Sequence, residues 1–231
     1  MIERVRAPNP GPLTLTGTNT WVVGRDPAWV VDPGPAIESH IEAVAAVVAA
    51  RGGAGGIALT HGHGDHSEAV PALRERLGVP VGDAATLADG DTFGPFRVLA
   101  VPGHADDHLV FVAGAAAFTG DAVLGQGSVF VSGRLREYLD GLRRLRALEL
   151  SVLCPGHGDE VTDPAAKLDE YLAHRAERER KLLDALAAGA RGEDELLDAA
   201  WADAAAAVRP FAAQSLRAHL EKLREEGRLP V

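Results

Sequence analysis

Short apolar runs alternate with apolar residues at helical spacing along the first two thirds of the chain. The run 57–59 has the length of a buried strand, whereas Val70, Leu73 and Leu77 recur on one face of a helix. The same patterns predict further strands over 14–23, 29–31, 79–81, 109–112, 117–119 and 152–154, a hairpin over 92–101, and helices over 37–50 and 135–150. Strands and helices in alternation are typical of a layered arrangement of both.

From about residue 164 the pattern becomes helical only. The spacing of Leu and Ala predicts three helices, over 164–188, 193–207 and 212–226. Gly189 and Pro210 mark the breaks between them, because both residue types interrupt helices. We therefore expect two domains, residues 1–163 and residues 164–231.

Potential metal ligands follow the ends of the expected strands. The stretch 60–67, THGHGDHS, lies between a strand and a helix, and its Gly residues allow the backbone to bend so that several side chains converge. A helix would not bring His61 and His63 together, because residues two apart point to different faces. Three more candidates follow later strands: His104, Asp121 and His157.

Seven such ligands are enough for two metal ions. We expect His61, His63 and His104 around one ion and Asp65, His66 and His157 around the other, with Asp121 bridging both. With one Cys in the chain, the donors are nitrogen and oxygen, which suit zinc, although manganese and iron are also compatible. Two divalent ions roughly 3.5 to 4 Å apart hold a bridging hydroxide at neutral pH. We therefore predict a dinuclear hydrolase with two Zn2+, in which Asp65 also orients the hydroxide and accepts its proton.

Composition and charge limit the partners. A chain of 231 residues with 46% hydrophobic residues can form one large core and a small appendage. A net charge of −10 argues against an extended surface for duplex nucleic acid. The sequence shows no basic, apolar leader and no apolar run of membrane length. We expect a cytoplasmic protein with no duplex nucleic acid and no membrane as partner, and a homodimer is compatible with it.

The candidate ligands together resemble the signature of a known family. HGHGDH at 61–66, His104 in VPGH, Asp121 in FTGD and His157 in CPGHG resemble the metal motifs of the metallo-β-lactamase superfamily. The resemblance covers roughly residues 10–160. It implies an α+β fold, a four-layered αβ/βα sandwich with two mixed sheets inside and a dinuclear site at one edge, followed by a small C-terminal helical domain.

Within the superfamily, the stretch 9–24, NPGPLTLTGTNTWVVG, resembles the N-terminal hairpin of the lactamase-β-like group. The animal member of that group is a mitochondrial endoribonuclease that acts on single-stranded RNA. The group also carries a C-terminal winged-helix-like domain, and the stretch 214–228 fits its last helix and wing. The resemblance therefore implies a phosphodiester of single-stranded RNA as substrate, with a small molecule as the alternative. Because acidic and basic residues mix in the last helix, we expect the C-terminal helices to form a lid over the cleft rather than a surface for duplex nucleic acid.

Four residues are candidates for supporting roles. Asp32 either caps a turn or orients the metal loop through hydrogen bonds. His108 stands where the superfamily often has a second His after PGH, or it is an ordinary strand residue. Thr18 and Asn19 either line the substrate groove or belong to the turn of the hairpin.

Several Arg residues of the C-terminal region alternate with acidic residues. Arg175, Arg178 and Arg180 stand beside Glu177 and Glu179. Residues three or four apart are neighbours on a helix, so we expect ion pairs within this helix.

Two other functions share the same ligands. A thioesterase of the hydroxyacylglutathione hydrolase type has the same metal set. A persulfide dioxygenase has a single iron held by two His and one carboxylate, which His61, His104 and Asp121 would supply. The complete second set disfavours the dioxygenase, and a catalytically silent binding module would require ligands to be lost, whereas none is lost here.

Overall fold

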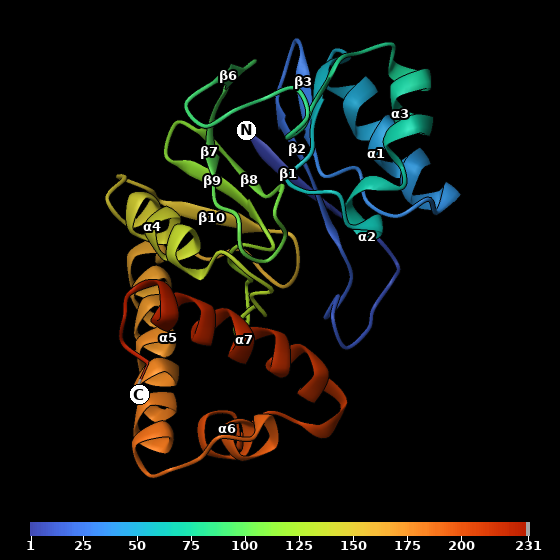
Figure 1. The fold of residues 1–231 in the computed structure, drawn as a ribbon. Coiled ribbons are helices and arrows are strands. Elements are labelled where there is room, and N and C mark those ends of the chain that lie inside the picture. Colours follow the sequence, from blue (N-terminus) through green and yellow to red (C-terminus); the bar gives the residue numbers. More distant parts are fainter. Residues whose placement is uncertain (230–231) are drawn as a thin grey trace.

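The computed structural model describes residues 1–229, so the last two residues of the expected C-terminal domain, Pro230 and Val231, lie outside it. Two five-stranded sheets pack against each other (Figure 1). The first sheet contains, in spatial order, β1 (Ile2–Arg6), β2 (Asn19–Gly24), β3 (Ala28–Val31), β4 (Ala54–Ala58) and β5 (Val81–Gly82). The second contains β10 (Val152–Pro155), β9 (Ala116–Gly120), β8 (Leu109–Ala113), β7 (Phe96–Ala100) and β6 (Thr92–Phe93).

Both sheets are mixed. In the first, β1, β2 and β3 are antiparallel, and β3, β4 and β5 are parallel. In the second, β10 runs parallel to β9, and the remaining pairs are antiparallel. The apolar pattern did not predict β1, because its sequence IERVR alternates weakly, and its pairing with β2 along the edge of the sheet supplies the hydrogen bonds that define it.

Alternation along β2 shows why both faces of the first sheet are covered. Trp21 and Val23 point into the space between the two sheets, whereas Val22 points to the opposite face. That outer face is covered by α1 (Glu38–Ala50) and α3 (Val70–Leu77).

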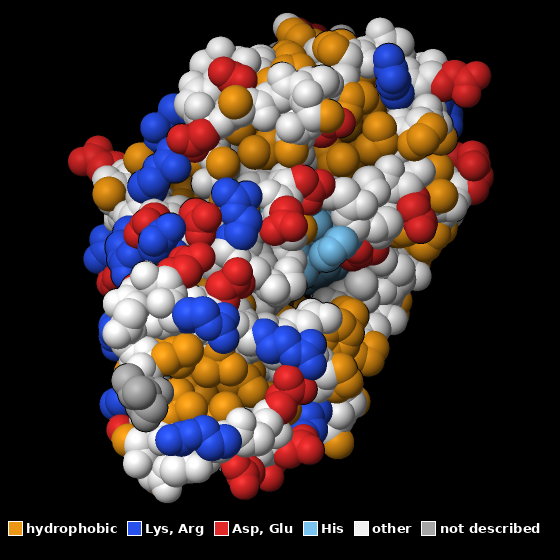
Figure 2. Space-filling model, viewed as in Figure 1, with side chains coloured by type: hydrophobic (Ala, Val, Ile, Leu, Met, Phe, Trp, Pro, Cys, Tyr) orange, Lys and Arg blue, Asp and Glu red, His pale blue; other side chains and the backbone are white. Residues whose placement is uncertain are grey.

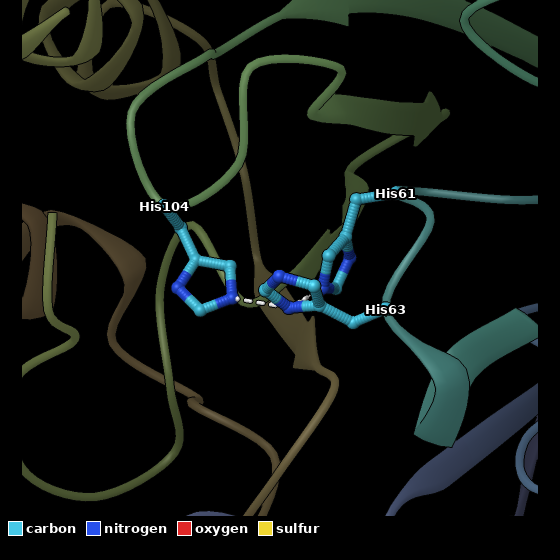
Figure 3. Close-up of side chains that lie close together, drawn as sticks. All are labelled: His61, His63 and His104. Atoms are coloured by element: carbon cyan, nitrogen blue, oxygen red, sulfur yellow. Dashed lines mark hydrogen bonds between the residues drawn. The ribbon is translucent and has the colours of Figure 1, made fainter. Parts of the chain in front are cut away.

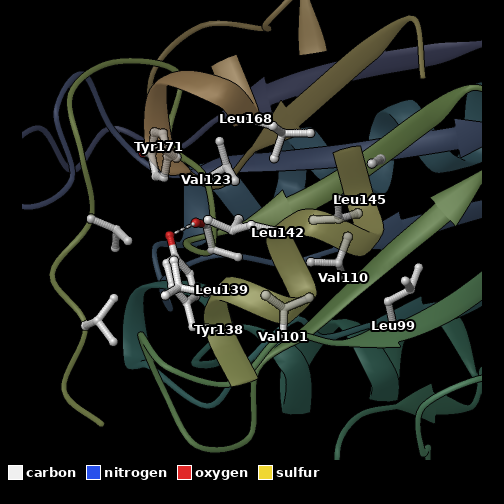
Figure 4. Packing of buried hydrophobic residues seen from close by; sticks show 14 of the residues in the cluster. Leu99, Val101, Val110, Val123, Tyr138, Leu139, Leu142, Leu145, Leu168 and Tyr171 are labelled. Atoms are coloured by element: carbon white, nitrogen blue, oxygen red, sulfur yellow. Dashed lines mark hydrogen bonds between the residues drawn. The ribbon is translucent and has the colours of Figure 1, made fainter. Parts of the chain in front are cut away.

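The outer face of the second sheet is covered by α4 (Leu135–Arg146). Leu142 and Leu145 of this helix pack in one cluster with Val110 of β8 (Figure 4). The Tyr138 hydroxyl of α4 donates a hydrogen bond to the Ala122 carbonyl at 2.7 Å. The order helix, sheet, sheet, helix confirms the expected four-layered sandwich.

The C-terminal region is helical and lies beneath the sandwich in Figure 1. It comprises α5 (Pro164–Ala187), α6 (Glu193–Ala200), the short 3-10 helix η1 (Ala206–Val208) and α7 (Arg209–Glu225). The long helix α5 belongs to two cores, because Leu168 and Tyr171 pack with the sandwich and Leu182 packs with α6 and α7. The C-terminal helices are thus attached to the sandwich through shared apolar packing.

Two details of this region differ from the expectation. The helix expected over 193–207 ends at Ala200, and its remaining length is an irregular turn followed by η1. The stretch 226–228, expected as part of a wing, forms a turn with Gly227 at φ +65°, and no strand follows β10 within residues 1–229. In the same part of the chain, no helix is long and apolar enough to cross a membrane.

Candidate metal centre

The expected ligands lie where strands of both sheets end. After β4, residues 59–63 form a loop, and α2 (Gly64–Ser67) is a single helical turn. Asp65 and His66 lie on this turn, so the expected strand-to-helix loop is open only as far as His63. The turn closes because the backbone N–H groups of His66 and Ser67 both donate to the His63 carbonyl at 3.0 Å.

Three imidazoles from two loops face one another (Figure 3). His63 Nδ1 lies 3.0 Å from His61 Nε2 and 3.0 Å from His104 Nε2. The three nitrogen atoms belong to one group whose potential ligand atoms lie within 4.8 Å of one another. Three ring nitrogens that converge in this way suit a cation in the middle.

Neighbouring oxygen atoms determine which nitrogen of these rings carries the proton. The Phe130 carbonyl lies 3.3 Å from His104 Nδ1 and can only accept, so His104 is protonated on Nδ1. Thr60 Oγ1 donates to Asp32 at 2.8 Å and therefore accepts from His61 Nδ1 at 3.0 Å. The Nε2 atoms of both rings thus direct lone pairs toward His63 Nδ1, and the same lone pairs are available to a metal ion.

A second group lies beside the first. His157 Nε2 is 3.2 Å from Asp65 Oδ2 and 3.3 Å from His66 Nε2. The Asp121 carboxylate lies between the groups, with one oxygen 3.5 Å from His66 and the other 3.5 Å from His104. Its buried Oδ1 has no hydrogen-bond partner among residues 1–229, as expected for an atom that would coordinate a metal. The structure therefore brings all seven expected side chains together.

Burial and neighbouring charges shift the pKa values within this centre. Burial lowers the pKa of His157, but hydrogen bonds with Asp121 and Asp65 raise it to about 9. Burial raises the pKa of Asp121, but His66 and His157 hold it well below its ordinary value. Burial and the adjacent imidazoles lower the pKa of His61. Ionised carboxylates and an unprotonated His61 are the states that metal binding requires, and a metal at His157 would displace its proton.

Asp32 supports the centre from behind. Its Oδ1 accepts from the Thr60 backbone N–H and its Oδ2 from the Thr60 hydroxyl, both at 2.8 Å. Oδ2 also lies 3.0 Å from His66 Nδ1, so His66 donates this hydrogen and leaves Nε2 free. These contacts are the ones expected of a residue that orients the metal loop through hydrogen bonds.

His108 is buried and packs directly behind His61. Its ring stacks on that of His61 at a centroid distance of 4.8 Å. Its Nε2 accepts a hydrogen bond from the Asp121 backbone N–H at 3.1 Å. His108 thus contacts two candidate ligands, His61 and Asp121, and lies in the outer part of the centre.

Thr18 and Asn19 do not line a groove, so that expectation is wrong. Both are fully buried. The Thr18 hydroxyl donates to Asp65 Oδ2 at 3.2 Å, and the Asn19 amide donates to the carbonyls of Pro155 and Gly158 at 3.0 and 2.8 Å. These polar groups face inward because the chain joins β2 here and ties the first sheet to the loop after β10. Thr18 therefore orients a candidate ligand, and Asn19 secures a loop.

A cavity of about 750 Å³ opens on the metal centre. In Figure 2, a His side chain (pale blue) lies in the hollow between the sandwich and the C-terminal helices, with hydrophobic side chains below it. The walls of the cavity come from the loop 12–15, the segment 124–132 and the start of α7. Its apolar lining residues are Pro12, Leu13, Leu15, Leu124, Val129, Phe130 and Phe211. No Lys or Arg of the described residues lines it.

The sequence interpretation missed Phe130 and Phe211 as cavity residues. Their rings lie 5.5 Å apart, one from the segment after β9 and the other from α7. The only local signal was an apolar triplet, 129–131, in a stretch rich in Gly and Ser. The docking of α7 determines whether this triplet faces the cavity, because the Val131 N–H donates to Ser215 Oγ of that helix at 3.0 Å.

Two mixed sheets between helices, with a His/Asp metal site at the ends of their strands, define a metallo-β-lactamase fold. Comparison with known proteins agrees with this class and is more specific. The family described as "Beta-lactamase associated winged helix domain" matches residues 193–229. The Beta-lactamase-like protein 2 homolog of Caenorhabditis elegans is 31% identical over 98% of this chain and 85% of that protein. The chain therefore belongs to the metallo-β-lactamase superfamily, as a β-lactamase-like protein with a β-lactamase-associated winged helix region.

Further relatives add detail. The "Atrochrysone carboxyl ACP thioesterase" of Aspergillus chevalieri is 36% identical over 80% of this chain, which spans 65% of that protein. A solved metallo-β-lactamase family protein from Thermus thermophilus is similar with a TM-score of 0.74 and 26% identity, over 98% of this chain and 94% of that one. A structure described as a di-iron-bound form of TTHA1623 is similar with a TM-score of 0.56 and 28% identity, over 71% of this chain and 96% of that one.

Proposed function

We propose that this protein is a dinuclear metal-dependent hydrolase that cleaves a thioester, or a related ester, with an apolar acyl group. One observation carries the proposal: five of the seven candidate ligands, His63, Asp65, His104, Asp121 and His157, line a cavity whose walls are largely apolar and, among the described residues, contain no Lys or Arg. The thioesterase among the relatives supports the choice of bond.

Each group of ligands would hold one ion. His61, His63 and His104 would hold the first, Asp65, His66 and His157 the second, and Asp121 would contact both. Zinc, manganese and iron all accept these donors, and two Zn2+ ions remain our prediction. The di-iron form of a similar protein supports two ions rather than one.

When bound, the ions would supply Lewis acidity and a hydroxide at neutral pH. The protein's own residues position the reaction. Asp65 is held by Thr18 and His157 at 3.2 Å each, and its partly exposed carboxylate faces the cavity, where it can orient the attacking water and accept its proton. The apolar walls exclude water and hold the acyl chain.

The leaving group distinguishes the candidate bonds. A thiol has a pKa of about 8.5, so a thiolate leaves without prior protonation, whereas an alkoxide requires a general acid.

Single-stranded RNA remains the second candidate. It is supported by the Phe130 and Phe211 pair, since aromatic rings can stack on bases. Apart from the metal ions, its phosphates would meet no Lys or Arg side chain in this cavity among the described residues.

Two remaining candidate functions have weaker support. S-lactoylglutathione, the substrate type of the hydroxyacylglutathione hydrolases, carries carboxylates and a small polar acyl group, for which the apolar walls offer no partner. A mononuclear iron dioxygenase would leave Asp65, His66 and His157 without an ion, although they converge as closely as the first group.

The test uses one preparation of the full chain. We expect close to two divalent ions per chain by elemental analysis, and hydrolysis of acyl thioesters that becomes more efficient with acyl length. The variants Asp65→Ala and His104→Ala should lose this activity. Cleavage of single-stranded RNA without thioester turnover would favour the second candidate. One iron per chain with no hydrolysis would contradict the proposal and favour the dioxygenase.

A further inference from the structure

A second cavity, of about 190 Å³, lies in the C-terminal region behind the wall of the metal cavity. It is lined by α5 residues, by Trp201 and Asp203 after α6, and by the segment 128–130. The same segment, 128–130, also lines the metal cavity, so one stretch of chain borders both. One water molecule occupies about 30 Å³ in the liquid, so this space can hold a small ion of several atoms.

Arg175 borders this cavity as a buried cation that forms no ion pair with a carboxylate of residues 1–229. The residue is 2% exposed. Its Nη2 donates to the Val129 carbonyl and to Ser128 Oγ, and its guanidinium lies 5.8 Å from the Tyr138 ring. Its Nε has no hydrogen-bond partner in residues 1–229. A guanidinium is always charged, and burial of such a charge is unfavourable unless an anion accompanies it.

The other Arg residues of α5 show the contrast. Arg180 pairs within the helix with Glu177, as expected, and also with Asp184. The expected pairing within the helix is wrong for Arg178, which turns away and binds Asp203 of the following turn. It is also wrong for Arg175, for which no ion pair is formed within the described part of the chain, because its side chain points into the core between α5 and the segment 128–130.

A chain of hydrogen bonds points a further donor toward the cavity. Arg178 Nε donates to His174 Nε2 at 3.1 Å, so His174 carries its proton on Nδ1. Burial, together with Arg175 and Arg178, lowers the pKa of His174 to about 4, which keeps the ring neutral at pH 7. His174 Nδ1 then donates to Ser128 Oγ at 3.2 Å. The Ser128 hydroxyl hydrogen is directed at the Val129 carbonyl at 3.5 Å, the outer limit of a hydrogen bond, so an oxyanion in the cavity can compete for it.

The one carboxylate on the lining is already neutralised. Both oxygens of Asp203 accept from the Arg178 guanidinium, at 2.6 and 2.7 Å. The remaining charge at the cavity is therefore that of Arg175. Arg guanidinium groups and hydroxyl donors are the groups that recognise phosphate in proteins.

We propose that this second cavity binds a small tetrahedral oxyanion, of which phosphate is the simplest, through Arg175 and Ser128. The proposal is independent of the bond that the metal centre cleaves. The ion is either free phosphate or a phosphate group on the leaving part of the substrate, and the experiment separates the two sources.

Binding at this cavity would be transmitted to the metal cavity. An oxyanion takes up donors that now hold Ser128 and Val129, and the next residue, Phe130, accepts from His104 Nδ1 at 3.3 Å. The segment 128–130 would shift between two sets of hydrogen bonds, and both cavities share it. If free phosphate is the ligand, it should therefore alter turnover even of a substrate that carries no phosphate.

Binding is measured first on the full chain with its metal removed by chelation. Trp201 lines the cavity and lies 5.5 Å from the Arg178 guanidinium, so its fluorescence reports on this site. We expect a saturable change on addition of phosphate, with one ion per chain by calorimetry. Trp201→Phe should lose the optical signal and keep the heat of binding. No saturable response beyond that of chloride at matched ionic strength would overturn the proposal.

Variants then locate the site. Arg175→Met should weaken phosphate binding roughly tenfold or more, and Arg175→Lys, which keeps the charge but loses the planar fork, should give an intermediate value. Arg175→Lys also decides the matter if Arg175→Met does not fold. Arg180→Met, which removes an exposed Arg of the same helix, should leave binding unchanged. An equal loss in Arg180→Met and Arg175→Met would show a general charge effect and contradict the site.

Turnover measurements show whether the bound phosphate is a free ion or part of the substrate. If the phosphate belongs to the substrate, free phosphate should raise the KM of a coenzyme A thioester, which carries phosphates, and leave kcat unchanged. If free phosphate is the ligand, it should change kcat of an N-acetylcysteamine thioester, which carries none. Without any thioester activity, the proposed function fails while the binding measurements on the metal-free chain still decide the site.

Discussion

The carboxylate of Asp32 offers a sharp test of how the metal centre is held, because one buried side chain orients two of its imidazoles. It accepts from the Thr60 N–H and hydroxyl at 2.8 Å and from His66 Nδ1 at 3.0 Å. The Thr60 hydroxyl in turn accepts from His61 Nδ1 at 3.0 Å. Asp32→Asn keeps the shape of the side chain but replaces one acceptor oxygen with an NH2 group.

The magnitude follows from the groups left unpaired. The new NH2 faces two buried donors, the Thr60 hydroxyl and His66 Nδ1, and each unsatisfied donor costs about 1 to 3 kcal/mol. The free energy of unfolding should therefore fall by about 2 to 6 kcal/mol if the rings keep their protons in place. If His66 instead moves its proton to Nε2, the stability loss is smaller and metal affinity should fall about 10- to 100-fold.

Two measurements follow both outcomes. Urea unfolding of the metal-free protein gives the stability, and competition with a chelating dye gives the metal affinity. Asp89→Asn is the matched control, because Asp89 is exposed and pairs with Arg144 at 2.8 Å, away from the centre. If Asp32→Asn matches this control in both stability and affinity, Asp32 does not orient the ligands and the reasoning is refuted.

Three further predictions concern stability and substrate. Burial lowers the pKa of His219 to about 3, below its value in the unfolded chain, so acid protonates the unfolded state first. As the pH falls from about 6.5 towards 3, the free energy of unfolding should therefore decrease by about 1.4 kcal/mol per pH unit. His219→Phe should flatten this dependence in urea unfolding of the metal-free protein. An unchanged slope in the variant would show that other groups cause it. Phe211→Ala removes apolar surface from the cavity wall, so it should raise the KM of long acyl thioesters about tenfold and leave their kcat nearly unchanged. The KM of acetyl thioesters should change little in the same initial-rate assay. An equal loss for all acyl lengths would argue against an acyl-binding wall. A metal ion present at 1,000 times its Kd stabilises the folded chain by about 4 kcal/mol, so chelation should lower the melting temperature and added zinc should restore it. A melting temperature that does not change with chelator would contradict binding of a metal to the folded chain.

Much of the candidate centre was predictable from local sequence. His61, His63 and His66 occur within six residues between a strand and a helix, and the later ligands each follow a strand. Strand ends gather at one edge of such a fold, so the residues that meet can be named before their distances are known. The metal ligands were predicted on this basis, and the structure places them together.

The residues that shape the cavity could not be predicted in this way. Thr18 and Asn19 have the composition of an exposed turn but are buried, because they join the two sheets across the molecule. Phe130 and Phe211 meet only because α7 docks against the segment before α4, and neither residue belongs to a local pattern that would indicate it. Local patterns report on backbone periodicity, and they contain no information on which distant surface an irregular segment will face.

The chain thus determined by itself the order of its strands and helices, the layered fold and the donors of a metal site, since these depend on periodicity and on residue chemistry at strand ends. Only the tertiary structure decided the tautomers of the imidazoles, the apolar walls and the burial of Arg175 with no ion pair among residues 1–229. Each of these depends on contacts between residues far apart in sequence, where burial and the position of one hydrogen bond determine whether a side chain is structural or available to a ligand.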